Sequence, residues 1–302
     1  SGTVYPERTA FPECFCRLDP HKGREIRRCF IQGGIQMLGR LIKYDLKYGA
    51  KLFIILHALL LLASILGRFF FLEKLDFSAE ANVLITSLGL FISIFLLLFT
   101  AVSFGVMLLL GIRFYKNLFT DEGYLTWTLP ATPAQQLWAK IISGTIWYVI
   151  DILLYSLSLY ILVSGKNVTT AYAEIASEVT ESLGMPLGRY SLYMLLFILA
   201  SSIGSVIMIY SCVAIGQLFP GHRVLCSVVA YIIISTIIQI FTFIILTALG
   251  IFPNGSNYPP GAGNVGHYLF KLFRLSGILI FVTTVLEYAA THYIMNKKVN
   301  LI

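Results

Sequence analysis

The sequence predicts an all-α polytopic membrane protein, with six transmembrane helices and an N-terminal amphipathic helix at the membrane interface. Two observations carry this prediction. Of the 302 residues, 57% are hydrophobic and 12% are charged, whereas an ordinary soluble domain has about 25% charged residues. The apolar residues also stand in blocks of about 20 or more, the length that spans a hydrocarbon core. This composition excludes a soluble globule, a disordered chain and a small disulfide-stabilised secreted domain.

The net charge of +7 does not predict nucleic-acid binding. The basic residues stand in short clusters at the ends of the apolar blocks, where they set membrane topology. Five cysteines are too few and too scattered for a disulfide framework. Membrane lipids are therefore the expected surroundings of this chain.

Residues 1–36 are polar, show no periodic element and lack the apolar region of a signal peptide. Cys14, Cys16, His21 and Cys29 suggest zinc, but their spacing matches no common structural zinc pattern. Residues 33–37 can be encoded by a bacterial ribosome-binding site followed by an ATG start codon, translated in frame. We therefore expect residues 1–36 to be a non-native upstream translation or a disordered tail, and the native protein to begin at Met37. N-terminal sequencing of the natural protein would test this expectation.

Residues 38–53 predict an amphipathic helix. Arg40, Lys43, Lys47 and Lys51 fall on one stripe at helical periodicity, and the opposite face is apolar. A basic amphipathic helix that leads into an apolar run usually lies in the membrane interface.

Residues 37–302 predict one transmembrane domain of six spans, at about 52–72, 83–112, 141–163, 191–215, 224–252 and 275–294. With the N-terminus in the cytoplasm, ten Lys and Arg residues are cytoplasmic and six are external. Positive charge favours the cytoplasmic side, so both termini should be cytoplasmic in a bacterial inner membrane. The second span is about 45 Å long, so its end should project as a stalk into the internal loop 113–140. Residues 170–183 predict a short amphipathic helix on the outer surface.

Several motifs suggest chemistry that their context does not support. Residues 261–266 match GxGxxG, but they follow two prolines in an external segment rather than a strand. The chain contains no GxxxxGK[ST] motif and no HExxH motif. We therefore expect no cofactor on this chain and no enzymatic activity of its own, and any ATP and Mg²⁺ would be bound by another chain.

Ionisable residues inside the spans are costly, at about 2.5–3.5 kcal/mol each near the bilayer centre. Asp151 lies near the middle of the third span, whereas His57 and Glu287 lie nearer the cytoplasmic side, where they could pair. These groups predict either a functional role, as a hydrated pathway or a coupling element, or a structural one, as a hydrogen bond between helices or a protonated acid. The sequence does not separate the two roles. A polar stripe on the fifth span, which includes Ser235, Gln239 and Thr242, is compatible with a conduit or with a packing seam.

The internal loop carries a family resemblance. Residues 113–140 resemble the loop of ABC-2 type transporter permeases, in which an acidic residue and a glycine precede a short apolar helix, a proline and a lysine that opens the next span. The matching elements here are Glu122, Gly123, Tyr124, Leu125, Trp127, Leu129, Pro130 and Lys140. Tyr124 departs from the pattern, which more often has a small residue there.

The resemblance implies a membrane subunit of an ABC transporter, and most bacterial relatives are exporters. Two such halves, identical or different, would pair and dock two ATP-binding subunits through a coupling helix at residues 122–129. That helix should end at Pro130, and Trp127 should anchor the docking interface, although a position in the headgroup belt would also suit a tryptophan.

Two other functions remain open at this stage. An intramembrane enzyme would need Asp151, Glu287 and His57 to converge on one cavity. A membrane scaffold or sensor would be distinguished from a transporter by its gene context, because a neighbouring reading frame with a P-loop would favour the transporter.

Overall fold

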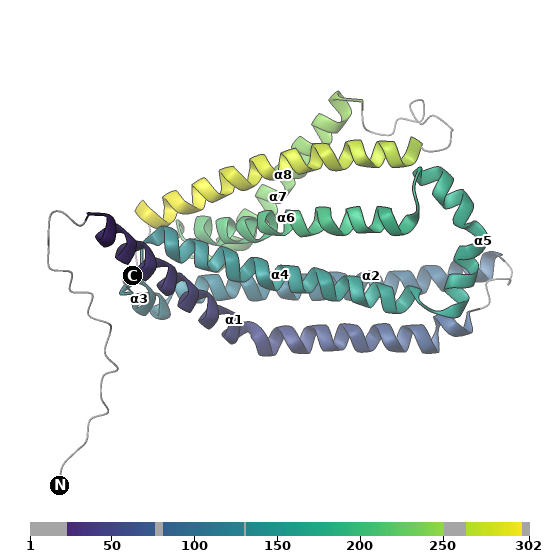
Figure 1. Ribbon diagram of the computed structural model, residues 1–302, viewed down its shortest axis with the longest axis horizontal. Helices are drawn as coiled ribbons and strands as arrows, with labels where there is room; N and C mark the ends of the chain where they lie inside the picture. Colours follow the sequence, from purple (N-terminus) through teal and green to yellow (C-terminus); the bar gives the residue numbers. More distant parts are fainter. Residues whose placement is uncertain (1–22, 76–80, 130, 251–263, 298–302) are drawn as a thin grey trace, which may run out of the picture.

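The computed structural model describes residues 23–75, 81–129, 131–250 and 264–297 (Figure 1). Within these ranges every regular element is helical, which confirms the predicted fold class. Six of the helices are long and apolar enough to cross a membrane, as expected for a multi-pass membrane protein. The elements are α1 (Gly23–Phe70), the short 3₁₀ helix η1 (Leu72–Lys74), α2 (Ala81–Phe119), α3 (Asp121–Trp127), α4 (Pro133–Val163), α5 (Lys166–Leu183), α6 (Leu187–Gly216), α7 (Arg223–Ala248) and α8 (Asn264–Lys297).

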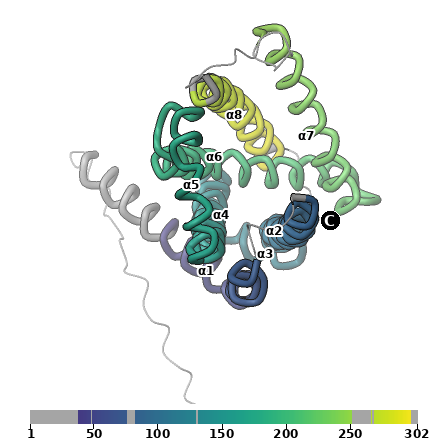
Figure 2. The backbone as a smooth tube through the Cα atoms, turned by 90° about the vertical axis from the view of Figure 1, so that its right-hand side faces the viewer, coloured from purple at the N-terminus to yellow at the C-terminus, as the bar shows by residue number. Residues whose placement is uncertain are grey.

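The bundle has two distinct ends. α1, α2, α4, α6 and α8 run along the long axis, with α3 at one end and α5 at the other (Figure 1). We call these the α3 end and the α5 end. α6 is the central helix, because it contacts α2, α4, α5, α7 and α8. α7 lies at the side of the bundle away from α1 and α4 (Figure 2).

The predicted interfacial helix is the first part of α1 rather than a separate element. Figure 1 shows that α1 bends, so that its first part is inclined to the part that crosses the bundle. Arg40, Lys43, Lys47 and Lys51 are all exposed, and Phe53 on the opposite face is buried, as the periodicity predicts.

The expectation of no regular element before residue 37 is wrong for part of that segment, since α1 begins at Gly23. The remaining residues, 1–22, which include Cys14, Cys16 and His21, lie outside the described residues. A start of the native protein at Met37 stays a prediction.

Most helices extend beyond the apolar limits predicted for the spans. α2 continues to Phe119, α4 begins at Pro133 and α8 begins at Asn264. Hydropathy marks the part of a helix that suits a membrane, whereas the backbone hydrogen bonds continue through polar residues. α8 therefore includes Asn264 and Gly266 from the end of the GxGxxG match, and the rest of that match lies outside the described residues. α7 is shorter than predicted and ends at Ala248.

α5 confirms the predicted surface helix. It contains no buried residue and joins α4 to α6 at one end of the bundle (Figure 1). Gly184 ends it in the left-handed conformation, with φ of 66°, which glycine adopts without the steric penalty of a side chain.

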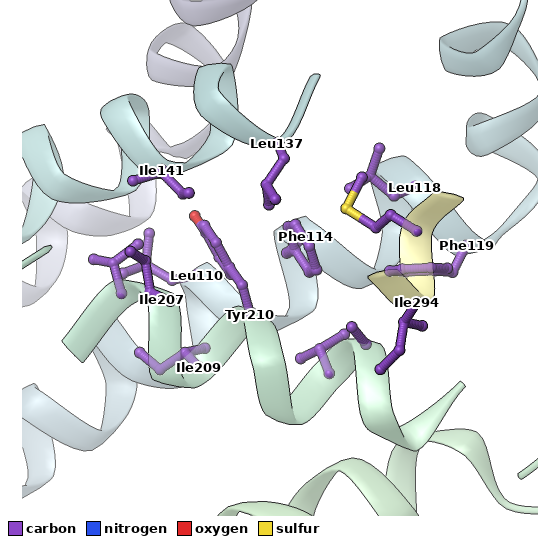
Figure 3. Close-up of a cluster of buried hydrophobic side chains, with 14 of the residues drawn as sticks. Leu110, Phe114, Leu118, Phe119, Leu137, Ile141, Ile207, Ile209, Tyr210 and Ile294 are labelled. Atoms are coloured by element: carbon purple, nitrogen blue, oxygen red, sulfur yellow. The ribbon is translucent and has the colours of Figure 1, made fainter. Parts of the chain in front are cut away.

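The largest apolar core lies toward the α3 end, where the ends of α2, α4, α6 and α8 meet. Its buried side chains include Phe114, Leu118, Leu137, Tyr210 and Ile294. Figure 3 shows the ring of Tyr210 beside Phe114, and the two rings are stacked with centroids 4.1 Å apart. The hydroxyl of Tyr210 donates to the carbonyl oxygen of Lys140 at 3.2 Å, so the core also joins α6 to α4.

The close packing of α4 against α6 depends on Gly144. A Cβ atom at this position would lie 2.5 Å from the hydroxyl oxygen of Tyr210 and 2.9 Å from Cγ1 of Val206. We expect Gly144→Ala to lower the free energy of unfolding by about 1–3 kcal/mol, because overpacking forces the helices apart. The thermal unfolding midpoint in detergent measures this effect. Gly89→Ala on α2 is the matched control, since its Cβ would meet no atom within 4 Å, and equal midpoints for the two variants would contradict the prediction.

Candidate functional site

The connection predicted at residues 113–140 lies between α2 and α4 at the α3 end, and it is mostly helical, with the expected extension of the second span and a short helix. α2 supplies its first residues up to Phe119, α3 spans Asp121–Trp127, and α4 begins at Pro133. The start of α4 is a capping box, in which the backbone N–H of Gln135 donates to Oγ1 of Thr132 and the backbone N–H of Thr132 donates to Oε1 of Gln135. The sequence carried this signal, since threonine followed by proline and, three residues on, glutamine is typical of a helix start.

Two hydrogen bonds hold α3 to the bundle. The side chain of its last residue donates one, and its backbone accepts the other. The indole Nε1 of Trp127 donates to the carbonyl oxygen of Leu118 at 3.0 Å. Nε2 of Gln136 on α4 donates to the carbonyl oxygen of Thr126 at 3.0 Å. Gly123 and Thr126 are the buried residues of α3. α3 is therefore held to both α2 and α4.

The predicted docking residues fall into two groups. Glu122, Tyr124, Leu125 and Leu129 are exposed, with 75% of Leu125 and 57% of Tyr124 accessible. Gly123 is buried, and Trp127 is half-buried against the apolar core. The outer surface of α3 thus carries Tyr124 and Leu125, whereas the indole predicted to anchor a partner packs inward.

The bounds of this helix also differ slightly from the prediction. α3 ends at Trp127 rather than Leu129, with the backbone N–H of Thr128 donating to the carbonyl oxygen of Tyr124 at 3.1 Å. Pro130, the predicted helix terminator, lies outside the described residues.

Next to α3, a buried carboxylate joins three helices. Asp45 on α1 accepts a hydrogen bond at Oδ1 from Nζ of Lys140 on α4 at 2.6 Å and from Nη2 of Arg113 on α2 at 3.1 Å. Oγ of Ser143 lies 3.5 Å from Oδ2 of Asp45. Asp45 and Lys140 are only 7% and 6% exposed, so neither charge is solvated by bulk water. Removing one partner of such a pair costs about 3–5 kcal/mol.

Sequence reasoning missed Asp45, although a signal was present. It is an acidic residue among the basic residues of an amphipathic helix, and by helical periodicity it belongs to the apolar side with Leu41 and Leu46. A charge on that side requires a buried partner. What periodicity does not reveal is which basic residue supplies it.

A series of polar pairs continues along the contact between α1 and α4. Nε2 of His57 lies 2.7 Å from Oδ1 of Asp151, and Nδ1 of His57 lies 2.7 Å from the carbonyl oxygen of Phe53. Further along, the hydroxyls of Ser64 and Ser158 are hydrogen-bonded. Each pair is separated by 94 residues in sequence, so the two helices run parallel in one constant register.

The predicted pairing of His57 with Glu287 is wrong, because His57 pairs with Asp151. The predicted span boundaries placed His57 on α1 about five residues out of register with Asp151 on α4, which is about 7.5 Å along a helix. The true register follows from helix–helix packing rather than from hydropathy. Glu287 lies on α8, is 9% exposed, and its Oε1 has no hydrogen-bond partner within the described residues.

The three polar residues predicted on the fifth span do not join the His57–Asp151 pair. Ser235 donates to the carbonyl oxygen of Ile232 and Thr242 to that of Ile238, both within α7. Gln239 is exposed. An apolar cavity of about 350 Å³ lies between α2, α6 and α7, and its lining includes Ser227 and Tyr231 of α7. An intramembrane enzyme would need Asp151, Glu287 and His57 to meet at one site. Of these three residues, only His57 and Asp151 are hydrogen-bonded to each other within the described residues.

The described part of the chain holds no group of three or more His, Cys, Asp or Glu residues that could bind a metal ion. Comparison of the chain with protein-family models, with curated proteins and with solved structures finds no match. The geometry of the α3 end therefore stands as the principal basis for a functional assignment.

Proposed function

We propose that this chain is the membrane subunit of an ATP-driven ABC transporter of the ABC-2 permease type, and that α3 docks a separate ATP-binding subunit. The observation that supports the proposal most directly is the pair Tyr124 and Leu125, exposed on a short helix whose other side is fastened to the bundle. An aromatic and an aliphatic side chain on a firmly held surface are typical of an interface that binds a partner.

The anchoring of α3 supplies a path for mechanical coupling. A displacement of α3 by a partner would act on α2 through the Trp127–Leu118 hydrogen bond and on α4 through the Gln136–Thr126 hydrogen bond. Asp45 would pass the displacement to α1, because its carboxylate binds groups from both α2 and α4. In this proposal ATP binding by the partner moves three spans together and so changes access to the transport path.

The proposal divides the chemistry between chains. The sequence has no P-loop, so ATP and Mg²⁺ would be bound by the partner, and this chain would itself catalyse no reaction. A second membrane half, either a second copy or a related chain, would complete the transport path. The α3 end would face the cytoplasm of a bacterium, in agreement with the excess of basic residues at that end, and the direction of transport would be export.

Leu125→Asp tests the docking role. A carboxylate at the centre of an apolar contact should reduce retention of the ATP-binding subunit tenfold or more, equivalent to about 1.4 kcal/mol or more of binding free energy. Affinity purification of the tagged chain from its native membrane, followed by ATPase assay and mass spectrometry, measures the retained subunit. Ile175→Asp on α5 is the matched control, because Ile175 is also exposed, at 50%, but lies at the opposite end of the bundle.

Cysteines at Tyr124 or Leu125 provide the second arm of this experiment. Docking predicts a crosslink from either position to a chain that contains a P-loop and hydrolyses ATP. If no such chain is retained by the wild type, or if Leu125→Asp retains as much of it as Ile175→Asp, docking through α3 is wrong.

A further inference from the structure

A cavity of about 150 Å³ lies beside the Asp45 cluster, between α1, α2, α4 and α6. The side chains with polar atoms in its lining are those of Asp45, Arg113, Lys116, Lys140, Ser143, Trp147 and Tyr210. At roughly 30 Å³ per water molecule in the liquid, the cavity has room for a small cluster of atoms such as a phosphorus atom and its oxygens. The three cations exceed the one carboxylate, so the cavity attracts an anion.

The hydrogen-bonding groups of the cavity are mainly donors. The ammonium of Lys140 has three N–H donors, and its hydrogen bond within the described residues goes to Asp45. The indole Nε1 of Trp147 is buried and has no hydrogen-bond partner in the described part of the chain. Both oxygens of Asp45 already face donors from the protein. A ligand that supplies further acceptor oxygens would satisfy these donors.

The cavity lies about 10 Å from the ends of α2 and α4 at the α3 end, a position that suits a lipid headgroup. Arg113 is six residues before the end of α2 at Phe119, which is about 9 Å along a helix. Lys140 is seven residues after the start of α4 at Pro133, which is about 10 Å. Leu52 and Ile112 also line the cavity and are about half exposed, so its mouth adjoins the apolar surface on which acyl chains would lie.

We propose that this cavity binds the phosphate group of an anionic phospholipid. Lys116 and Lys140 would face the phosphate oxygens, Trp147 would donate to one of them, and the acyl chains would pack on Leu52 and Ile112. Basic pockets between transmembrane helices suit anionic headgroups. The inference goes beyond docking of an ATP-binding subunit and does not depend on it.

The exposed basic stripe of α1 argues for a lipid rather than a dissolved phosphate. Arg40, Lys43, Lys47 and Lys51 are exposed on the helix that also carries Asp45 and Leu52 of the cavity lining. Such a stripe concentrates anionic lipids at the membrane surface. It places the lipid source next to the mouth of the cavity.

The experiment measures retention of dioleoyl-phosphatidylglycerol and dioleoyl-phosphatidylcholine by the purified full chain, using native mass spectrometry. Lys116→Gln and Trp147→Phe should each weaken binding of the anionic lipid about three- to tenfold, the effect of losing one hydrogen bond or charge contact. Trp147→Phe keeps an aromatic ring that can stack on Phe53 (ring centroids 4.3 Å apart), so the delipidated protein should stay folded, with only a small fall in its unfolding midpoint. Lys166→Gln at the start of α5 is the matched control, because it removes the same charge from an exposed residue that lies outside both the cavity lining and the basic stripe of α1.

A second arm distinguishes the sources of phosphate. Glycerol 3-phosphate and inorganic phosphate should displace the bound lipid only at far higher concentration, because neither has acyl chains. The proposal is overturned if phosphatidylcholine is retained equally well, if Lys166→Gln weakens binding as much as Lys116→Gln, or if the soluble phosphates bind as tightly as the lipid. Lys116 is exposed, so the test does not depend on a variant that disturbs the core.

Discussion

Asp45→Ala is expected to lower the free energy of unfolding by about 3–5 kcal/mol, the usual cost of removing one partner from a buried ion pair. The substitution leaves the ammonium of Lys140, which is 6% exposed, without the carboxylate oxygen 2.6 Å away. Arg113 loses its bond to the same oxygen. Because these contacts join α1 to α2 and α4, the loss should appear as a large drop in the thermal unfolding midpoint in detergent.

A double-variant cycle isolates the electrostatic part of this effect. Lys140→Met should also be destabilising, since it leaves the carboxylate without its nearest cation. The combination of Asp45→Ala with Lys140→Met should cost less than the sum of the two single changes, because the double variant buries no uncompensated ammonium. Asp121→Ala on α3 is the control, since it removes an exposed carboxylate from the same end of the bundle and should change stability by about 0.5 kcal/mol or less. Strict additivity of the two single effects would reject the ion-pair explanation.

Asp151→Ala should be the next most damaging change, at about 3 kcal/mol, because it strands the Nε2 group of His57 in a part of the bundle where water cannot replace the lost partner. The N–O distance of 2.7 Å and the 3–4% exposure of the two residues indicate a close and well-shielded bond. Ser158→Ala on the same helix is the comparison, since it removes a hydroxyl from the neighbouring polar pair. It should cost less, about 1 kcal/mol. Equal losses for the two variants would argue against a special role of the His57–Asp151 pair in stability.

Asp151→Asn separates structure from transport. Asparagine keeps an oxygen beside Nε2 of His57, so assembly and partner retention should persist. If Asp151 belongs to a hydrated pathway, transport by this variant should fall while the unfolding midpoint stays close to that of the wild type. Wild-type transport by the asparagine variant would leave only the structural role, as a bond between α1 and α4.

The sequence predicts features that depend on local pattern. Helical periodicity identified the exposed stripe of Arg40, Lys43, Lys47 and Lys51, and also the surface helix α5. The length of the second apolar block predicted the stalk that α2 extends to Phe119. These predictions hold because each depends on one helix and its contact with lipid or water. The capping box of Thr132 and Gln135 is equally local, and the sequence pattern alone is enough to predict that a helix starts there.

What the amino-acid sequence determined by itself is therefore the all-helical class, the six spans and a short helix predicted at residues 122–129, which the structure places at Asp121–Trp127. Only the tertiary structure decided that Asp45 meets Lys140, that His57 meets Asp151 rather than Glu287, and that Trp127 packs inward while Tyr124 and Leu125 remain exposed. The physical reason is that hydropathy measures affinity for lipid and carries little information on the axial register of two packed helices. That register is set by side-chain packing, such as the fit of Gly144 against Tyr210, and it decides which polar groups lie close enough to bond.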